Sequence, residues 1–210
     1  MGPTILLLER REVVMTNESI LWRAIYWSGH EACRLFRVES EWRLEGTAVF
    51  SYEGRSCRLT YFIACDLSWT TLRAQVSGWV HNDEVNLALT ADAYRHWQLN
   101  GVTKEAVEGC IDLDLNFSPS TNLLPIRRLN LEVGQQAAVK AAWLKFPSFE
   151  LEPLPQLYTR VDELKYKYSS GRAGIVSELT VNKTGFVTLY PGLWEVEGSG
   201  FVSAAIPLGS

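Results

Sequence analysis

The sequence predicts a mainly β, single-domain protein built on a meandering antiparallel sheet that is rolled or closed. Apolar and polar residues alternate with a period of two along most of the 210 residues, as in strands with one buried face. Turn signals rich in Gly, Asn and Asp separate these segments at short intervals. No Pro/Ser-rich linker, low-complexity run or internal repeat divides the chain, so one domain is the simplest account.

The clearest strand covers residues 85–93, where Val85, Leu87 and Leu89 alternate with polar or small residues. In chain order, the other expected strands are residues 33–38, 43–52, 58–65, 71–80, 111–115, 164–168, 175–181 and 186–190. The turns between them are expected at Glu53-Gly54, His81-Asn82-Asp83, Asn100-Gly101, Ser170-Gly171 and residues 182–185. Short strands at this spacing are typical of a sheet that curls on itself.

Three further segments do not follow from alternation alone. Thr103–Glu108 and Leu123–Leu129 are the expected short helices. Gln135–Phe146 is rich in alanine, which favours a helix by propensity, but its residues also alternate as a strand would.

The stretch from Gly109 to Leu129 is the most informative part of the chain. Strand alternation places Asp112 and Asp114 on the face opposite Leu113. The same stretch contains a turn rich in Ser, Thr and Asn, two prolines and the adjacent Arg127-Arg128 pair. This composition indicates a polar cluster that is held in place rather than a bare connection.

The run GCIDLDLNFSPSTNLLPIRRL in this stretch resembles the signature of the bacterial family of putative glycolipid-binding proteins, whose fold is described as a spiral β-roll. Four more stretches follow in the order of that family: DLSWTTLR at 66–73, FPS at 146–148, QLYTR at 156–160 and YPGLW at 190–194. The resemblance as a whole covers residues 21–194. The resemblance implies a single-domain antiparallel spiral β-roll with one or two short helices, favours a strand for Gln135–Phe146, and implies a lipid or glycolipid ligand.

The β-roll domain is expected over residues 15–197, with an N-terminal extension at 1–14 and a C-terminal tail at 198–210. The apolar run Ile5–Leu8 is shorter than a signal peptide requires, and no apolar window approaches the length of a membrane span. The four cysteines show no C-x-x-C spacing, which suits a reducing compartment. The cytoplasm is therefore the expected location.

Composition and motifs exclude several function classes. A formal charge of -4 and a pI near 5.5 offer no electrostatic footprint for nucleic acid. Asp112-x-Asp114-x-Asn116 copies the opening of an EF-hand loop, but Phe117 and Leu123 stand where the loop needs Gly and Glu. No nucleophile elbow, P-loop, dinucleotide-binding or zinc-protease motif occurs. We therefore expect no metal, no cofactor and no catalytic residues.

The candidate ligand-binding residues combine charge with aromatic surface. The aspartates either pair with arginines at a cavity mouth or cap the turn and stabilise the sheet. Adjacent arginines point in different directions, so one of Arg127 and Arg128 should reach the aspartates while the other faces water. Most of the eight tryptophans are expected in the core, with Trp69, in a turn, as the exception. The full set of candidates is Asp66, Trp69, Arg73, Asp112, Asp114, Asn122, Arg127, Arg128, Tyr158 and Arg160.

The expected function is non-catalytic binding of an amphiphile, with acyl chains in the apolar interior and the polar head near the Asp/Arg cluster. One alternative is a hydrolase acting on a lipid or carbohydrate, which requires a His within reach of a carboxylate and of a Ser or Cys. A second alternative is a structural or protein-interaction module, whose core would be packed without room for a ligand.

Overall fold

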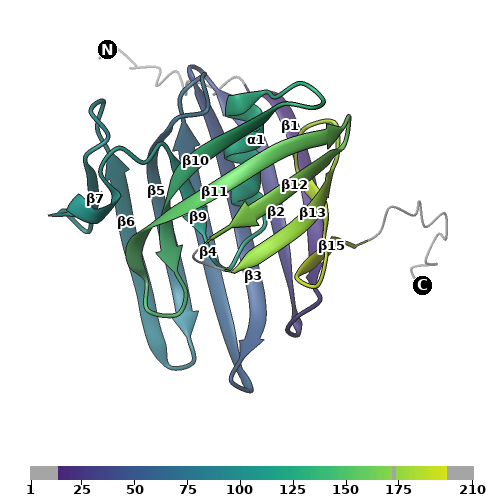
Figure 1. Ribbon diagram of the computed structural model, residues 1–210. Helices are drawn as coiled ribbons and strands as arrows, with labels where there is room; N and C mark the ends of the chain where they lie inside the picture. The colour runs from purple at the N-terminus through teal and green to yellow at the C-terminus, as the bar shows by residue number, and fades with distance from the viewer. Residues whose placement is uncertain (1–13, 172–173, 198–210) are drawn as a thin grey trace, which may run out of the picture.

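A computed structural model describes residues 14–171 and 174–197, so nearly all of the expected extension and tail lies outside the described residues. Within them, fifteen strands form one continuous sheet that folds back over itself (Figure 1). Neighbouring strands are antiparallel, except that β9 and β10 run parallel. The chain is mainly β and folds as a single domain, as the sequence predicts.

The first half of the chain is a meander in which each strand pairs with the next. Its strands are β1 (Val14–Ala24), β2 (Gly29–Val38), β3 (Glu41–Tyr52), β4 (Arg55–Cys65), β5 (Thr71–Val80), β6 (Asp83–Ala91), β7 (Trp97–Leu99) and β8 (Val102–Thr103). The chain then crosses to the second layer through η1 (Glu105–Val107), β9 (Asp112–Leu115), η2 (Ser120–Asn122) and α1 (Leu123–Leu129).

The second half is another meander, and it returns to the first strand. Its strands are β10 (Gln136–Lys145), β11 (Glu150–Asp162), β12 (Lys165–Ser170), β13 (Ile175–Val181), β14 (Val187–Tyr190) and β15 (Trp194–Val196). β15 pairs with β1, with Trp194 opposite Ala24. In Figure 1 the green strands β10–β13 cross in front of the blue strands of the first meander. The terminal strands of the order, β8 and β9, do not pair, so the sheet is an open roll.

The core lies between the two layers. Leu113 and Leu115 on β9 are 1% and 0% exposed, so one face of this strand is fully apolar. Helix α1 buries Leu123, Leu124 and Ile126 between the layers. Burying a side chain of this size stabilises the fold by about 1.5–3 kcal/mol. The apolar side of α1 is therefore part of the core and contacts β9.

The predicted elements agree with the structure where alternation or composition is strong. α1 covers the residues expected, and the alanine-rich segment forms strand β10. The expected helix at Thr103–Glu108 is wrong at its ends, because only Glu105–Val107 forms a 3₁₀ turn and Thr103 belongs to β8.

Strands β1, β7, β8, β11 and β15 were not predicted from the sequence. β11 contains Pro153 and Pro155, which argue against an interior strand because proline has no N–H to donate. Both prolines lie before Gln156, where pairing with β12 starts. The backbone nitrogens of both prolines therefore lie on the β12 side of β11, before β12 pairs with it, so no hydrogen bond between strands is lost.

None of the helices in the described ranges is long and apolar enough to cross a membrane. The four cysteines are buried and unpaired.

Candidate functional site

A crevice of about 190 Å³ lies between the two layers, where the β1–β2 turn, the β14–β15 turn and the segment after β9 meet. Its polar lining comes from Asp114, Asn116, Ser118 and Asn122, and its aromatic lining from Tyr26, Trp27, Trp143, Tyr168, Tyr190 and Trp194. We call this space the crevice.

The aromatic wall of the crevice is centred on Trp27. Its ring packs edge-to-face on Trp194 at 5.8 Å between centroids and also contacts Phe50 at 5.8 Å. The indole Nε1 is buried and has no acceptor among the described residues. A buried indole N–H usually finds a partner, and leaving one unpaired costs about 1–3 kcal/mol. Trp27 therefore lines the crevice and carries an indole donor that has no partner among the described residues.

Asp114 is the acidic group of the crevice. Its Oδ2 accepts a hydrogen bond of 2.7 Å from Nε2 of Gln156, which also lies 3.1 Å from the Tyr168 hydroxyl. Burial raises the pKa of Asp114 to about 6, the Gln156 hydrogen bond lowers it, and the nearby Asp112 carboxylate raises it. Burial also raises the pKa of the Tyr168 and Tyr190 hydroxyls, which are therefore neutral donors near pH 7.

Asn122 forms another part of the polar wall. It immediately precedes α1, and its Nδ2 donates to the Tyr158 hydroxyl over 2.9 Å. Tyr158 is 1% exposed and packs against Tyr168 at 5.0 Å between ring centroids. Tyr158 therefore lies directly behind the wall and orients Asn122.

The expected pairing of an aspartate with an arginine is confirmed. Arg128 donates from Nε and a terminal nitrogen to the two carboxylate oxygens of Asp112, over 2.9 and 2.6 Å. The Asp112 side chain is 1% exposed and that of Arg128 17%. This buried bidentate pair ties α1 to β9. Neither residue lines the crevice, so the pair supports the site without belonging to it.

Arg127 faces away from the aspartates, as the different directions of adjacent side chains predict. Its guanidinium carbon lies 5.0 Å from the ring centroid of Trp69, and the residue is exposed. Trp69 itself is 6% exposed and stacks on Trp42 at 4.6 Å. Trp69 is therefore a packed residue of the β4–β5 turn and not a wall of the crevice.

The candidates Asp66, in the same turn, and Arg73, on β5, also make their contacts outside the crevice. Asp66 accepts the backbone N–H groups of Ser68 and Thr70 over 2.8 and 2.9 Å, so it stabilises its own turn. Arg73 forms a bidentate pair with Glu41 over 2.6 and 2.7 Å rather than with the aspartates.

Arg160 donates to the backbone carbonyls of Leu131 and Glu163, at 2.7 Å each. It meets Arg127 at a separate depression of about 290 Å³, which Lys183 and Glu163 also line.

Of the ten candidates, the structure places only Asp114 and Asn122 in the crevice, with Tyr158 behind them. Sequence reasoning missed Trp27, Gln156 and a buried glutamate, Glu31. A signal existed for Glu31, because it shares the inward period of Cys33 and Leu35 and is a carboxylate on an apolar face. The predicted strand began at Cys33 and so left this position out.

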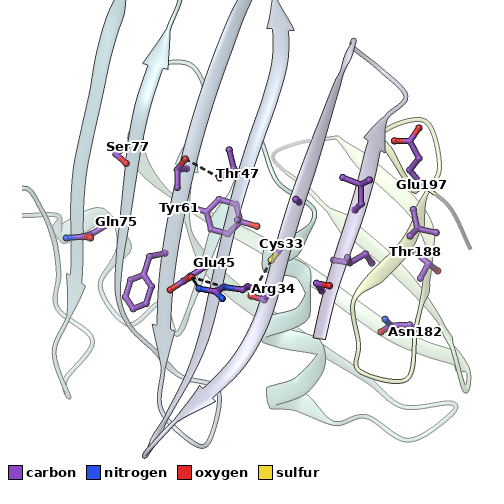
Figure 2. Close-up of a pocket in the computed structure, with 18 residues that line it drawn as sticks. Cys33, Arg34, Glu45, Thr47, Tyr61, Gln75, Ser77, Asn182, Thr188 and Glu197 are labelled. Carbon is purple, nitrogen blue, oxygen red and sulfur yellow. Dashed lines mark hydrogen bonds and ion pairs between the residues drawn. The ribbon is translucent and has the colours of Figure 1, made fainter. Parts of the chain in front are cut away.

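A broader groove of about 1020 Å³ lies on the outer face of β1–β5 (Figure 2). It is lined mainly by small polar and apolar residues, among them Thr47, Gln75 and Ser77. Its charged groups pair with each other or with neighbours: Arg34 binds Glu45 at 2.5 Å, and Glu197 binds His30 at 2.7 Å. The crevice, which combines an unused donor with a carboxyl whose pKa is raised, is therefore the candidate site.

Comparison with known proteins gave two matches. Over residues 19–196 the chain matches the family described as putative glycolipid-binding. It is also similar to a crystal structure of a DUF1089 family protein from Pseudomonas aeruginosa, with 28% sequence identity and a TM-score of 0.69. That alignment covers 92% of this chain and 99% of the other. A comparison with curated proteins found no match.

Proposed function

The chain belongs to the family described as putative glycolipid-binding, and on that premise we propose that it binds an amphiphile of the lipid or glycolipid class without catalysing a reaction. We place the polar end of this ligand in the crevice. The proposal rests on one observation: Trp27, whose buried indole donor has no partner among the described residues, and Asp114 line the same aromatic crevice.

The volume of the crevice supports this orientation of the ligand. At about 190 Å³ it is smaller than the ~300–1,000 Å³ of sites that enclose a whole small-molecule ligand. It equals the volume of roughly six water molecules at ~30 Å³ each, which suits one ring but not a long chain. The sequence-based expectation of acyl chains filling the interior therefore changes: side chains such as Leu113 and Leu115 already fill it.

The chemistry of the wall suits a sugar ring. Each sugar hydroxyl both donates and accepts, so one can accept from the Trp27 indole while another donates to Asp114. The C–H face of the ring can pack on an aromatic side chain such as Trp194 or Tyr190. The apolar chain of the ligand would then leave through the mouth, where Tyr26 is 76% exposed.

The three histidines support binding over hydrolysis. His30 pairs with Glu197, His81 contacts the backbone oxygen of Tyr52, and His96 pairs with Asp92. Each is therefore engaged outside the crevice. A hydrolase with a histidine as its general base would need that histidine beside a nucleophile at the ligand.

Binding of octyl β-D-glucoside, below its micelle concentration, tests the proposal. The probe carries one sugar ring and one short chain, and tryptophan fluorescence or calorimetry reports its binding. Trp27→Phe keeps the aromatic ring and removes the N–H, so affinity should fall about 2- to 10-fold, the value of one hydrogen bond of ~0.5–1.5 kcal/mol. Trp42→Phe is the matched control, because Trp42 stacks on Trp69 away from the crevice.

The same assay with octanol and with free glucose separates the two ends of the ligand. The protein should prefer the glucoside to both. If octanol bound as tightly as the glucoside, and if Trp27→Phe left the affinity for octanol unchanged, the crevice would not recognise the sugar.

A further inference from the structure

A second polar cluster lies deeper in the roll, behind the wall of the crevice. Its centre is Glu31 on β2, which is 0% exposed. Trp22 of β1 and Ala48 of β3 lie opposite it in the sheet. Glu31 does not line the crevice and has no role in the binding geometry described above, yet a carboxyl buried to this extent needs a physical explanation.

Four oxygen atoms form a closed ring in this cluster. The Tyr61 hydroxyl lies 2.6 Å from Glu31 Oε1 and 2.7 Å from Ser120 Oγ. Ser118 Oγ lies 2.7 Å from Ser120 Oγ and 2.6 Å from Glu31 Oε1, which closes the ring.

A glycine makes this ring possible. A Cβ atom at Gly46 would lie 2.3 Å from the Tyr61 hydroxyl oxygen. Only glycine at this position therefore leaves room for the phenol group of Tyr61 to cross β3. Figure 2 shows the Tyr61 hydroxyl pointing toward the strand that carries Cys33, which is β2.

The ring requires four protons. Each short contact between two oxygens needs one hydrogen between them, and three hydroxyl groups supply three. An ionised carboxylate only accepts, so with Glu31 ionised one of the four contacts would be a bare repulsion between oxygens. A protonated Glu31 supplies the missing hydrogen.

The surroundings of Glu31 agree with this proton count. Its second oxygen, Oε2, is buried and has no partner among the described residues, which an ionised carboxylate tolerates poorly. No lysine, arginine or histidine pairs with Glu31 in residues 14–171 and 174–197.

We propose that Glu31 is a neutral carboxylic acid in the folded protein near pH 7, and that its proton completes a hydrogen-bonded ring that positions the Ser118–Asn122 wall of the crevice. Ionisation of Glu31 in alkaline solution then loosens this wall and weakens ligand binding. Ser118, Pro119 and Asn122 line the crevice, so Glu31 acts through them as a positioning residue. The effect on ligand rests on the proposed function, but the protonation of Glu31 does not.

The direction of the titration follows from burial. Burial raises the pKa of Glu31 to about 8, and the hydrogen bonds from Ser118 and Tyr61 lower it less than burial raises it. The titratable groups that face it are Tyr61 on β4 and Cys33 on its own strand, and burial raises the pKa of both. Both therefore stay neutral while Glu31 ionises.

Carbon-13 NMR of the glutamate side chains tests the protonation directly. In the full chain, one carboxyl should remain protonated at pH 7, titrate near pH 8, and disappear in Glu31→Gln. Ser120→Ala opens the ring and leaves Glu31 Oε1 with two hydroxyl donors, Tyr61 and Ser118. In this variant the ionised form has one hydrogen for each remaining contact between oxygens. Ionisation therefore becomes easier, and the ionisation constant of Glu31 should rise about tenfold. A Glu31 that is already ionised at pH 7 would overturn the proposal.

The positioning role has its own readouts. The amide signals of Ser118 and Asn122 should shift with the Glu31 midpoint in the parent protein and stay unchanged across that range in Glu31→Gln. Affinity for octyl β-D-glucoside should fall several-fold above pH 8 in the parent and stay flat in Glu31→Gln. If the amide signals of Ser118 and Asn122 did not change as Glu31 titrates, the positioning role would be wrong. Absence of glucoside binding at every pH would instead overturn the proposed function and leave the NMR result to decide on Glu31.

Discussion

Removing the guanidinium of Arg128 should be one of the most destabilising single changes at the α1–β9 contact. Arg128 binds both oxygens of Asp112, and the Asp112 side chain is 1% exposed. Arg128→Ala leaves that carboxylate buried without its cation, and breaking a buried pair in this way costs about 3–5 kcal/mol. Because the Arg128 side chain is 17% exposed, water can reach the vacated space, and we expect about 3 kcal/mol.

Arg127→Ala is the matched control for this prediction. The two arginines are adjacent, but the guanidinium of Arg127 lies over the Trp69 ring at 5.0 Å at an exposed site. A cation–π contact of this kind contributes about 0.5–1 kcal/mol. Urea unfolding at pH 7 should therefore separate the two variants by at least ~2 kcal/mol.

The double variant Asp112→Ala/Arg128→Ala distinguishes an unpaired charge from lost packing. Removing both partners leaves no buried charge, so the double variant should be less destabilised than the sum of the single variants. If Arg128→Ala and Arg127→Ala had the same stability, or if the effects of Asp112→Ala and Arg128→Ala were additive, our interpretation of the buried pair would be wrong.

Three further changes have definite expected outcomes. Asp114→Asn should stabilise the protein at pH 8 but not at pH 3.5. The folded-state pKa of Asp114, about 6, lies above the ordinary aspartate value of 3.8, so its stabilising contribution is complete below pH 3.8 and is lost as pH rises through 6. Urea unfolding at pH 8 should show a gain of about 1–3 kcal/mol for Asp114→Asn. Equal effects at both pH values would contradict this prediction. Gly46→Ala should cost about 1–3 kcal/mol in thermal unfolding, because its Cβ would overlap Tyr61, whereas Gly171→Ala, with open space around it, is the control. Arg73→Ala should change stability by at most ~1 kcal/mol, since the Arg73 side chain is 42% exposed. It should leave glucoside binding unchanged, and weaker binding would show that Arg73 belongs to the binding site.

The local pattern of the sequence was enough to predict most of the strands and helix α1. The strand Thr71–Val80 and the helix Leu123–Leu129 have the bounds that alternation and composition indicate. These elements depend on residues a few positions apart, whose spacing decides which face becomes buried. The same argument predicted that Arg127 and Arg128 would differ, because direction along a helix is a local property.

The membership of the crevice could not be predicted in this way. Asp114 is hydrogen-bonded to Gln156, 42 residues away along the sequence, and Ser118 is hydrogen-bonded to Glu31, 87 residues away. Which of these groups come together depends on strand register and on how far the sheet rolls. Asp66, Trp69 and Arg73 share the composition of a binding cluster, but the β4–β5 turn and the start of β5 place them away from the crevice.

The sequence by itself determined the mainly β class, the inward and outward faces of most strands, and a polar cluster held in place after Gly109. Only the tertiary structure decided that Asp112 stabilises α1 while Asp114 lines the crevice, although the two lie two positions apart on β9. It also decided that a crevice of about 190 Å³ remains between the layers. The physical reason is that alternation sets the direction of a side chain, whereas its partner and the remaining volume depend on packing between layers far apart in the chain.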